Sequence, residues 1–336
     1  MIGCLQLIAS RTLFPGINGI ERAISKKDAM VPYRTTIQVL IVIVALLIGA
    51  CDRPKQFPEP KKTWGQQELL IGVIPEQDVF RQREHYMVLK KYLYDRLGIT
   101  VNFTNLSRYG NIVERFATEN MDGGFFDSFT YALAHDQLGV EPLARPVNLD
   151  GTSTYRGHIF VRKDSGIRTA AQMKGKRFAF VERATTAGYL YPLAYLRENG
   201  ITNPQAYLGG TFFAGSPEAA IQAVLNDEAD IGAAKDTIYE LLAAENPRIE
   251  KELVVLTSSR VLPLNCLAVR RDLDPELIHA LKKALLDMEK DTDGIETLRR
   301  FGARGFIETN NKDYEYLYQL SAQVGIDLKT YRYKNE

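Results

Sequence analysis

The chain has few of the cysteines and histidines that build disulfide frameworks and metal centres, and it has no marked excess of basic residues. It has three cysteines and four histidines in 336 residues. The histidines, His85, His135, His158 and His279, do not show the close pairwise spacing typical of a metal site. Its 42 basic and 41 acidic residues leave a net charge of +1. Because no basic excess exists, we expect no nucleic-acid partner, and we expect no bound metal.

Catalytic motifs are also absent from the sequence. There is no Gly-x-Ser-x-Gly elbow and no phosphate-binding Walker loop. We therefore expect neither an enzyme nor a cofactor. Cys266 lies in the apolar segment Leu264–Val269, where a free cysteine is most often a small core residue.

Long apolar runs are scarce, and the longest lies near the N-terminus. The run Val39–Ala50 is shorter than the about 20 residues that a membrane-spanning helix needs. It follows Arg34 and ends in Ile-Gly-Ala before Cys51, which resembles a bacterial lipobox. We expect Cys51 to be lipidated and to become the mature N-terminus. An ordinary signal peptide or an uncleaved anchor is the alternative.

The chain is expected to begin with regions that do not belong to its fold. Residues 1–50 read as a signal peptide, and Met30 would give a leader of ordinary length. Residues 51–66 hold the lipidated cysteine and a proline-rich, charged tether. The folded part would then lie outside the cytoplasm, anchored to a bacterial membrane.

From residue 67 onward, apolar strand-like segments alternate with helix-like segments. Leu69–Ile74 suits a buried strand, and residues 82–97 carry apolar residues at helical spacing. This βα order predicts parallel sheets. The pattern restarts after residue 153, which predicts two lobes: 67–153 with 262–336, and 154–261. The chain is expected to cross between them near residues 151–156 and 259–264.

Polar helix starts follow several predicted strands. Thr185, Thr186 and Gly188 form a hydroxyl-rich turn after the strand Arg177–Val181. The first backbone N–H groups of a helix lack partners and favour anions, so this turn suits an oxyanion. Similar starts occur at Ser128, Ser216 and Asp236. Ordinary helix capping explains each of them equally well.

Several short segments follow one another along the chain in an order that points to a known family. They are Lys163–Ile167, Met173–Phe180, Thr185–Tyr189, Gly215–Ile221 and Asp230–Asp236, joined more loosely by Gly72–Pro75 and Phe126–Tyr131. Over residues 68–325 the chain resembles the phosphate, phosphite and phosphonate solute-binding proteins of ABC transporters. The resemblance implies a class II periplasmic-binding-protein fold, with two α/β lobes and a hinged ligand cleft.

The resemblance also implies a set of ligand-binding residues. They are Tyr109, Tyr131, Thr185, Thr186 and Asp236. Ser128, Ala187, Gly188 and Ser216, which lie at the helix starts described above, complete the predicted binding site. Two positions depart from the family pattern: Ala187 replaces a hydroxyl, and Pro217 replaces a histidine. His158 could supply the missing donor, although a structural histidine fits the same position. These departures put the identity of the ligand in doubt, whereas the expected fold is unaffected.

Two functional hypotheses remain open at this point. In the first, the chain captures a small oxyanion and delivers it to the permease and ATPase subunits of an ABC transporter. In the second, it presents its ligand to a membrane histidine kinase or cyclase. The two differ in the protein partner and share the same binding event.

Overall fold

The computed structural model describes residues 67–75, 79–109 and 111–333, all of which belong to one compact unit. The predicted signal peptide, Cys51 and the tether lie outside the described residues. Among the residues that the structure describes, no helix is both long enough and apolar enough to cross a membrane.

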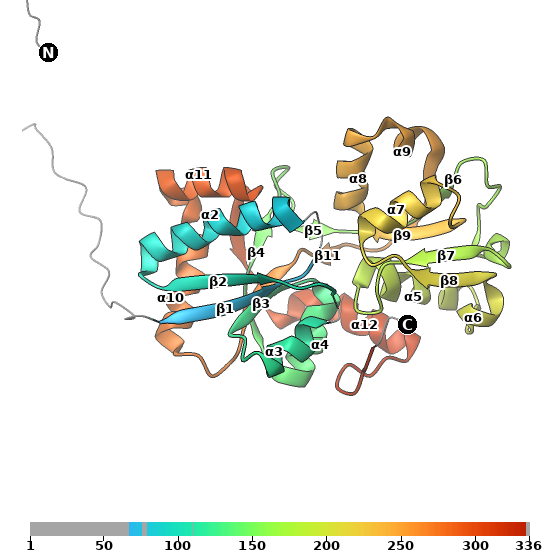
Figure 1. Cartoon of the computed structure of the whole chain (residues 1–336). Coiled ribbons are helices and arrows are strands. Elements are labelled where there is room, and N and C mark those ends of the chain that lie inside the picture. The colour runs from blue at the N-terminus through green and yellow to red at the C-terminus, as the bar shows by residue number, and fades with distance from the viewer. Residues whose placement is uncertain (1–66, 76–78, 110, 334–336) are drawn as a thin grey trace, which may run out of the picture. The chain divides into compact units, whose positions relative to one another are not determined.

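The first lobe is built on a six-stranded sheet (Figure 1). In spatial order its strands are β13 (Gly305–Glu308), β4 (Glu141–Val147), β12 (Cys266–Val269), β3 (Gly123–Phe126), β1 (Glu68–Val73) and β2 (Thr100–Asn105). Helices α2 (Val79–Leu97), α10 (Pro275–Leu286) and α11 (Thr292–Phe301) share a hydrophobic cluster with one face of the sheet. Helices α3 (Asn111–Thr118) and α4 (Ser128–Leu138) pack on the other face. A short helical turn, η3 (Met288–Lys290), joins α10 to α11.

The second lobe repeats this layered arrangement on a five-stranded sheet. In spatial order its strands are β10 (Leu253–Ser258), β6 (Gly157–Arg162), β9 (Ile231–Lys235), β7 (Arg177–Phe180) and β8 (Gly210–Phe213). One face is covered by η1 (Ala170–Met173), α5 (Tyr191–Glu198) and α6 (Pro204–Tyr207), and the other by α7 (Pro217–Leu225), α8 (Asp236–Glu245) and α9 (Pro247–Glu252). The π-helical turn η2 (Thr186–Leu190) leads into α5.

The chain passes from the first sheet to the second between β4 and β6, and returns between β10 and β12. Two short strands lie on these crossing segments and pair with each other: β5 (Thr154–Tyr155) and β11 (Leu262–Pro263). The exact residues at which each lobe begins and ends remain a prediction.

The prediction of parallel sheets is confirmed for part of each sheet, where β1 pairs with β2 and β3 and where β7 pairs with β8 and β9, and is wrong for the rest. Strands β2 and β3 run parallel to β1, but β12 pairs antiparallel with both β3 and β4. In the second sheet, β6 pairs antiparallel with both β9 and β10. The physical reason is the path of the chain, because β6 and β12 carry it into a sheet from the opposite lobe. Strand β13 adds a further antiparallel edge.

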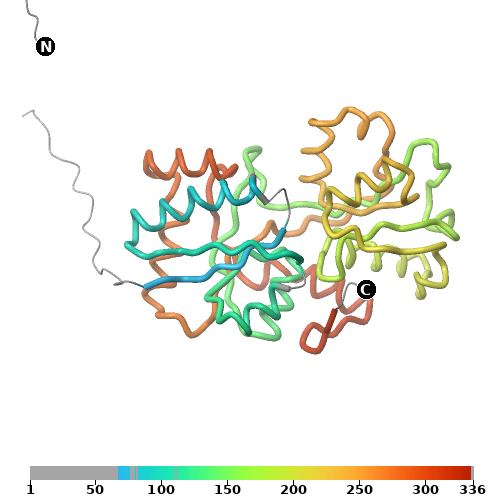
Figure 2. Tube along the Cα trace, in the orientation of Figure 1, coloured from blue at the N-terminus to red at the C-terminus, as the bar shows by residue number. Residues whose placement is uncertain are grey.

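The C-terminal segment contacts both lobes. It begins with the turn η4 (Asn311–Tyr314) and continues as α12 (Glu315–Val324), which packs against both α4 and α5. Gln323 Nε2 on α12 donates to Glu198 Oε1 at 2.9 Å. Figure 2 traces this segment, in red, beside both halves of the described chain. The lobes are therefore tied by a helix as well as by the two crossing segments.

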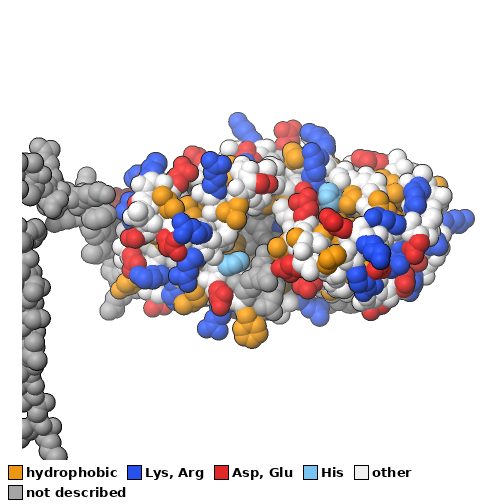
Figure 3. Space-filling view, turned by 90° about the horizontal axis from the view of Figure 1, so that it is seen from above, with side chains coloured by type: hydrophobic (Ala, Val, Ile, Leu, Met, Phe, Trp, Pro, Cys, Tyr) orange, Lys and Arg blue, Asp and Glu red, His pale blue; other side chains and the backbone are white. Residues whose placement is uncertain are grey.

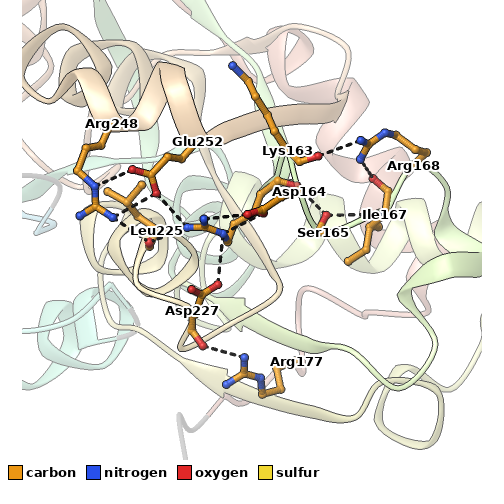
Figure 4. Close-up of polar contacts among 11 residues, drawn as sticks. Lys163, Asp164, Ser165, Ile167, Arg168, Arg177, Leu225, Asp227, Arg248 and Glu252 are labelled. Carbon is orange, nitrogen blue, oxygen red and sulfur yellow. Dashed lines mark hydrogen bonds and ion pairs between the residues drawn. The ribbon is translucent and has the colours of Figure 1, made fainter.

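An ion-pair network at the end of β6 stabilises the second lobe (Figure 4). Arg162 lies within 3.3 Å of carboxylate oxygens of Asp164, Asp227 and Glu252. Arg248 also pairs with Glu252, at 2.8 Å. Hydrogen bonds from Arg248 and Arg162 lower the pKa of Glu252 to about 2. The network joins β6 to α9 and to the loop that follows α7.

Candidate functional site

The turn at Thr185–Thr186 lies where β7 gives way to the helical segment η2–α5. Thr185 has extended backbone, and the Leu190 N–H donates to its carbonyl at 3.1 Å, which is the wide π-helical spacing. The Thr185 hydroxyl donates to the Glu182 carbonyl at 2.6 Å and is thereby used within the turn. Thr186 follows, and its N–H and hydroxyl are both directed away from this local network.

Gly188 lets the turn lie close to the end of the strand. A Cβ atom on Gly188 would lie 2.3 Å from Val181 Cγ2 and 2.4 Å from Val181 Cβ. The Val181 N–H donates to the Gly188 carbonyl at 3.1 Å, which fixes this close approach. Only glycine leaves room here, so the sequence signal at this position has a steric cause.

The donors of Thr186 meet a carboxylate from the first lobe. Both the Thr186 N–H and the Thr186 hydroxyl donate to Asp127 Oδ2, each at 3.3 Å. Asp127 is the N-cap of α4, and its Oδ1 accepts from the Thr130 N–H and the Thr130 hydroxyl, each at 2.8 Å. Asp127 is 1% exposed and Thr186 is fully buried. The turn therefore binds an anionic oxygen, which here belongs to the chain itself.

Two predicted ligand residues bind the crossing segments. The Ser128 hydroxyl donates to the carbonyl of Pro263 on β11 at 2.9 Å. Asp236 Oδ2 accepts from the Arg156 N–H at 2.8 Å, and the Asp236 N–H donates to the Arg156 carbonyl at 2.9 Å. Both side chains thus help to fix the segments that join the lobes.

Three further predicted residues have contacts away from the turn. The Tyr131 hydroxyl donates to Asn311 Oδ1 at 3.1 Å, and its ring lies 4.2 Å from that of Tyr314. Tyr109 is buried in the hydrophobic cluster that draws on both lobes. Ser216 is the N-cap of α7, and its Oγ accepts from the Ala219 N–H at 3.1 Å. Local capping accounts for Ser216 fully.

The two positions that depart from the family pattern are both buried. Ala187 is 3% exposed and packs beside Gly157, where an added Cβ would lie 3.3 Å from the Ala187 Cβ. Pro217 is buried in the first turn of α7. His158 makes its contacts within the second lobe, with Ser258 Oγ at 3.0 Å and the Tyr239 ring at 6.0 Å. Burial lowers the pKa of His158.

Sequence reasoning missed the roles of Asp127 and Lys235. Lys235, at the end of β9, is 5% exposed; its Nζ donates to Asn265 Oδ1 at 2.7 Å and lies 4.7 Å from the centre of the Tyr155 ring. Both residues lie at the end of a strand and precede a helix, which was the available signal. Their partners are distant in sequence, however, so the sequence alone could not indicate these contacts.

On the face drawn in Figure 3, basic and acidic side chains are interspersed over both halves. Among residues 67–75, 79–109 and 111–333, no group of three or more His, Cys, Asp or Glu side chains is placed to share a metal ion.

Two solved structures share this architecture. A binding protein component of an ABC phosphonate transporter from Pseudomonas aeruginosa superimposes with a TM-score of 0.70 at 20% identity, covering 78% of this chain and 87% of that one. PhnD1 of Prochlorococcus marinus in complex with methylphosphonate gives a TM-score of 0.68 at 21% identity, covering 77% and 98%. These likenesses show the two-lobe α/β binding-protein fold.

Sequence comparison identifies the family. The phosphate-import protein PhnD of Mycolicibacterium smegmatis is 28% identical over 256 residues, which cover 71% of this chain and 77% of that protein. A probable ABC transporter phosphite binding protein, PhnD1, of Prochlorococcus marinus is 22% identical over 297 residues, covering 86% and 98%. Residues 71–314 match the family model of the phosphonate periplasmic substrate-binding proteins of ABC transporters. The chain is thus a member of this family, whose proteins bind solutes for transport and are not enzymes.

Proposed function

We propose that this chain is an extracytoplasmic, lipid-anchored solute-binding protein that captures a small phosphorus oxyanion for an ABC transporter. The ligand belongs to the class of phosphonate, phosphite and phosphate. The loaded protein then docks on the permease, which works with its ATPase subunits.

The contact between Thr186 and Asp127 is the observation that carries this proposal. Two donors of one residue, a backbone N–H and a hydroxyl, both reach the same carboxylate oxygen. Donors arranged in this way at a helix start suit an oxyanion oxygen of a ligand equally well. Both partners are buried, so a ligand in this place would be shielded from water.

Membership of the family supports the class of ligand but leaves the compound open. The names of the relatives refer to phosphate, phosphite and phosphonates. Ala187 and Pro217 lack the hydroxyl and the histidine that the family pattern leads one to expect. We therefore assign the chemical class, and leave the choice within it to experiment.

The membrane anchor is proposed from the sequence alone. Lipidation of Cys51 would hold the binding protein near its permease, with residues 52–66 as a tether. Replacing Cys51 with serine should move the protein from the membrane fraction to the soluble fraction. A Cys51→Ser variant that stays in the membrane fraction would contradict lipidation at this cysteine.

Calorimetric titration of the purified chain tests the ligand class. The panel is phosphate, phosphite, methylphosphonate, aminoethylphosphonate, sulfate and small carboxylates. We expect one phosphorus oxyanion to bind with one-to-one stoichiometry. Thr186→Val, which keeps the shape but removes the hydroxyl, should weaken binding severalfold, because a hydrogen bond to a charged ligand contributes about 1.5–3 kcal/mol whereas the 3.3 Å bond to Asp127 that the ligand replaces is the weaker one.

Thr211→Val in the exposed strand β8 is the matched control, and its affinity should equal that of the unmodified chain. Binding of a phosphorus oxyanion that Thr186→Val leaves unchanged would place the ligand elsewhere. Absence of binding to every phosphorus compound would contradict the proposed function. Cross-linking to a kinase or cyclase, rather than to a permease, would favour the sensory alternative.

A further inference from the structure

The carboxylate of Asp127 accepts hydrogen bonds from donors in both lobes. Oδ1 accepts two hydrogen bonds from Thr130, and Oδ2 accepts two from Thr186. An ionised carboxylate offers about four acceptor positions, so no position remains for a further donor. The side chain is 1% exposed, and water therefore has little access to it.

We propose that the Asp127 carboxylate is an internal competitor, which occupies the turn at Thr185–Thr186 when no ligand is bound. This competition sets the affinity of the turn for an external oxyanion. This inference rests on the proposed function, because it takes the Thr186 donors to be the donors that a ligand uses. A ligand oxygen must replace Asp127 Oδ2 at these donors, since two anionic oxygens cannot share them and would repel each other.

The hydrogen-bond lengths indicate that Asp127 releases Thr186 more readily than it releases Thr130. The two bonds to Thr130 are 2.8 Å long, and the two bonds to Thr186 are 3.3 Å long. The longer pair is the weaker pair, because 3.3 Å lies beyond the usual range for N–H···O bonds. Asp127 can therefore release Thr186 while it still caps α4.

The exchange also couples binding to the contact between the lobes. Asp127 precedes α4 in the first lobe, and Thr186 begins η2 in the second. Without ligand, a direct carboxylate contact joins these two helix starts. With ligand, the oxyanion takes the place of that contact at Thr186. The affinity measured for any oxyanion is then reduced by the competition with Asp127.

Asp127→Asn separates the two roles of the side chain. Asparagine keeps a side-chain oxygen that can cap α4, and it is among the preferred N-cap residues. Its NH₂ group cannot accept from Thr186, so the turn is left open to an external anion. We expect phosphate, phosphite and methylphosphonate to bind about tenfold tighter than to the unmodified chain, a change equal to about 1.4 kcal/mol.

Asp150→Asn is the matched control for the loss of one negative charge. Asp150 Oδ1 accepts from the Thr152 N–H and the Thr152 hydroxyl at 2.8 Å each, as Asp127 does from Thr130, but it is exposed to solvent. We expect its affinity to stay within about twofold of the unmodified chain. If Asp127→Asn does not fold, Asp127→Ser provides a second capping residue without the competing charge.

Titration of these chains with phosphate, phosphite, methylphosphonate and sulfate distinguishes the two proposals. Tighter binding by Asp127→Asn, but not by Asp150→Asn, supports the proposal that Asp127 competes with the ligand. Equal or weaker binding by Asp127→Asn, with binding retained in the unmodified chain, overturns the competitor and leaves the proposed function standing. Binding of no phosphorus compound by either chain overturns the proposed function, and the competitor with it.

Discussion

Gly188→Ala should damage both the stability and the binding of the chain. The new methyl group would lie 2.3–2.4 Å from two carbon atoms of Val181. Rotation of the valine cannot relieve this overlap, because one of the two atoms is Cβ, whose position the backbone fixes. The end of β7 and the start of η2 must therefore move apart, which breaks or lengthens the 3.1 Å bond from the Val181 N–H to the Gly188 carbonyl.

Overpacking of this kind costs about 1–3 kcal/mol of the free energy of unfolding. For a chain of this size, that cost lowers the melting temperature by roughly 2–4 °C per kcal/mol. Thr186 precedes the displaced glycine by two residues, so the affinity for the oxyanion should fall by about tenfold or more. Thermal unfolding and calorimetric titration of the same preparation measure both effects.

Gly210→Ala is the control for this prediction. The nearest atom to a Cβ on Gly210 is Arg177 Cγ at 4.0 Å, so the methyl group has room. Its free energy of unfolding should stay within about 0.5 kcal/mol of the unmodified chain. If Gly188→Ala matched Gly210→Ala in both melting temperature and affinity, the steric reasoning about the turn would be refuted.

Three further predictions concern other parts of the described structure. Hydrogen bonds from two arginines hold the pKa of Glu252 at about 2, below its usual 4.5, so the stabilisation that they provide is complete above about pH 5 and is lost as the pH falls towards 2. The melting temperatures of Glu252→Gln and of the unmodified chain should therefore differ at pH 7 and converge at low pH. A difference that stays constant with pH would contradict this. Tyr331→Phe removes a 3.2 Å bond to the carbonyl of Arg183 and should cost about 0.5–1.5 kcal/mol in urea unfolding; no measurable cost would mean that this bond is not kept in solution. Burial raises the pKa of Cys266 to about 12, so its peptide should stay unmodified by iodoacetamide in the native chain and react in urea; equal labelling in both conditions would show that the thiol is accessible.

Local signals in the sequence predicted many of the elements. Continuous apolar residues indicated β1, and apolar residues at helical spacing over residues 82–97 indicated α2. Threonines followed by a glycine indicated the start of η2, where the structure shows the π-helical turn. These features depend on neighbouring residues, which is why the sequence alone was sufficient.

Features that depend on distant partners could not be predicted in the same way. Strands β8 and β13 are short and contain a glycine, so neither has a strong apolar pattern. The antiparallel pairing of β12 follows from the return of the chain from the second lobe.

The candidate site shows the same limit. The sequence indicated polar helix starts at Ser128, Thr186 and Asp236, and these helix starts exist. It could not show that Ser128 and Asp236 bind the crossing segments, because those partners are far along the chain. Nor could it show that Asp127 reaches Thr186, which lies 59 residues away.

The most direct test of the account is a crystal structure of the chain grown with the phosphorus oxyanion that binds best in the titrations. The account predicts a ligand oxygen within hydrogen-bond distance of the Thr186 N–H and hydroxyl, with Asp127 Oδ2 displaced from both. A ligand bound elsewhere, with the contact between Asp127 and Thr186 unchanged, would contradict it.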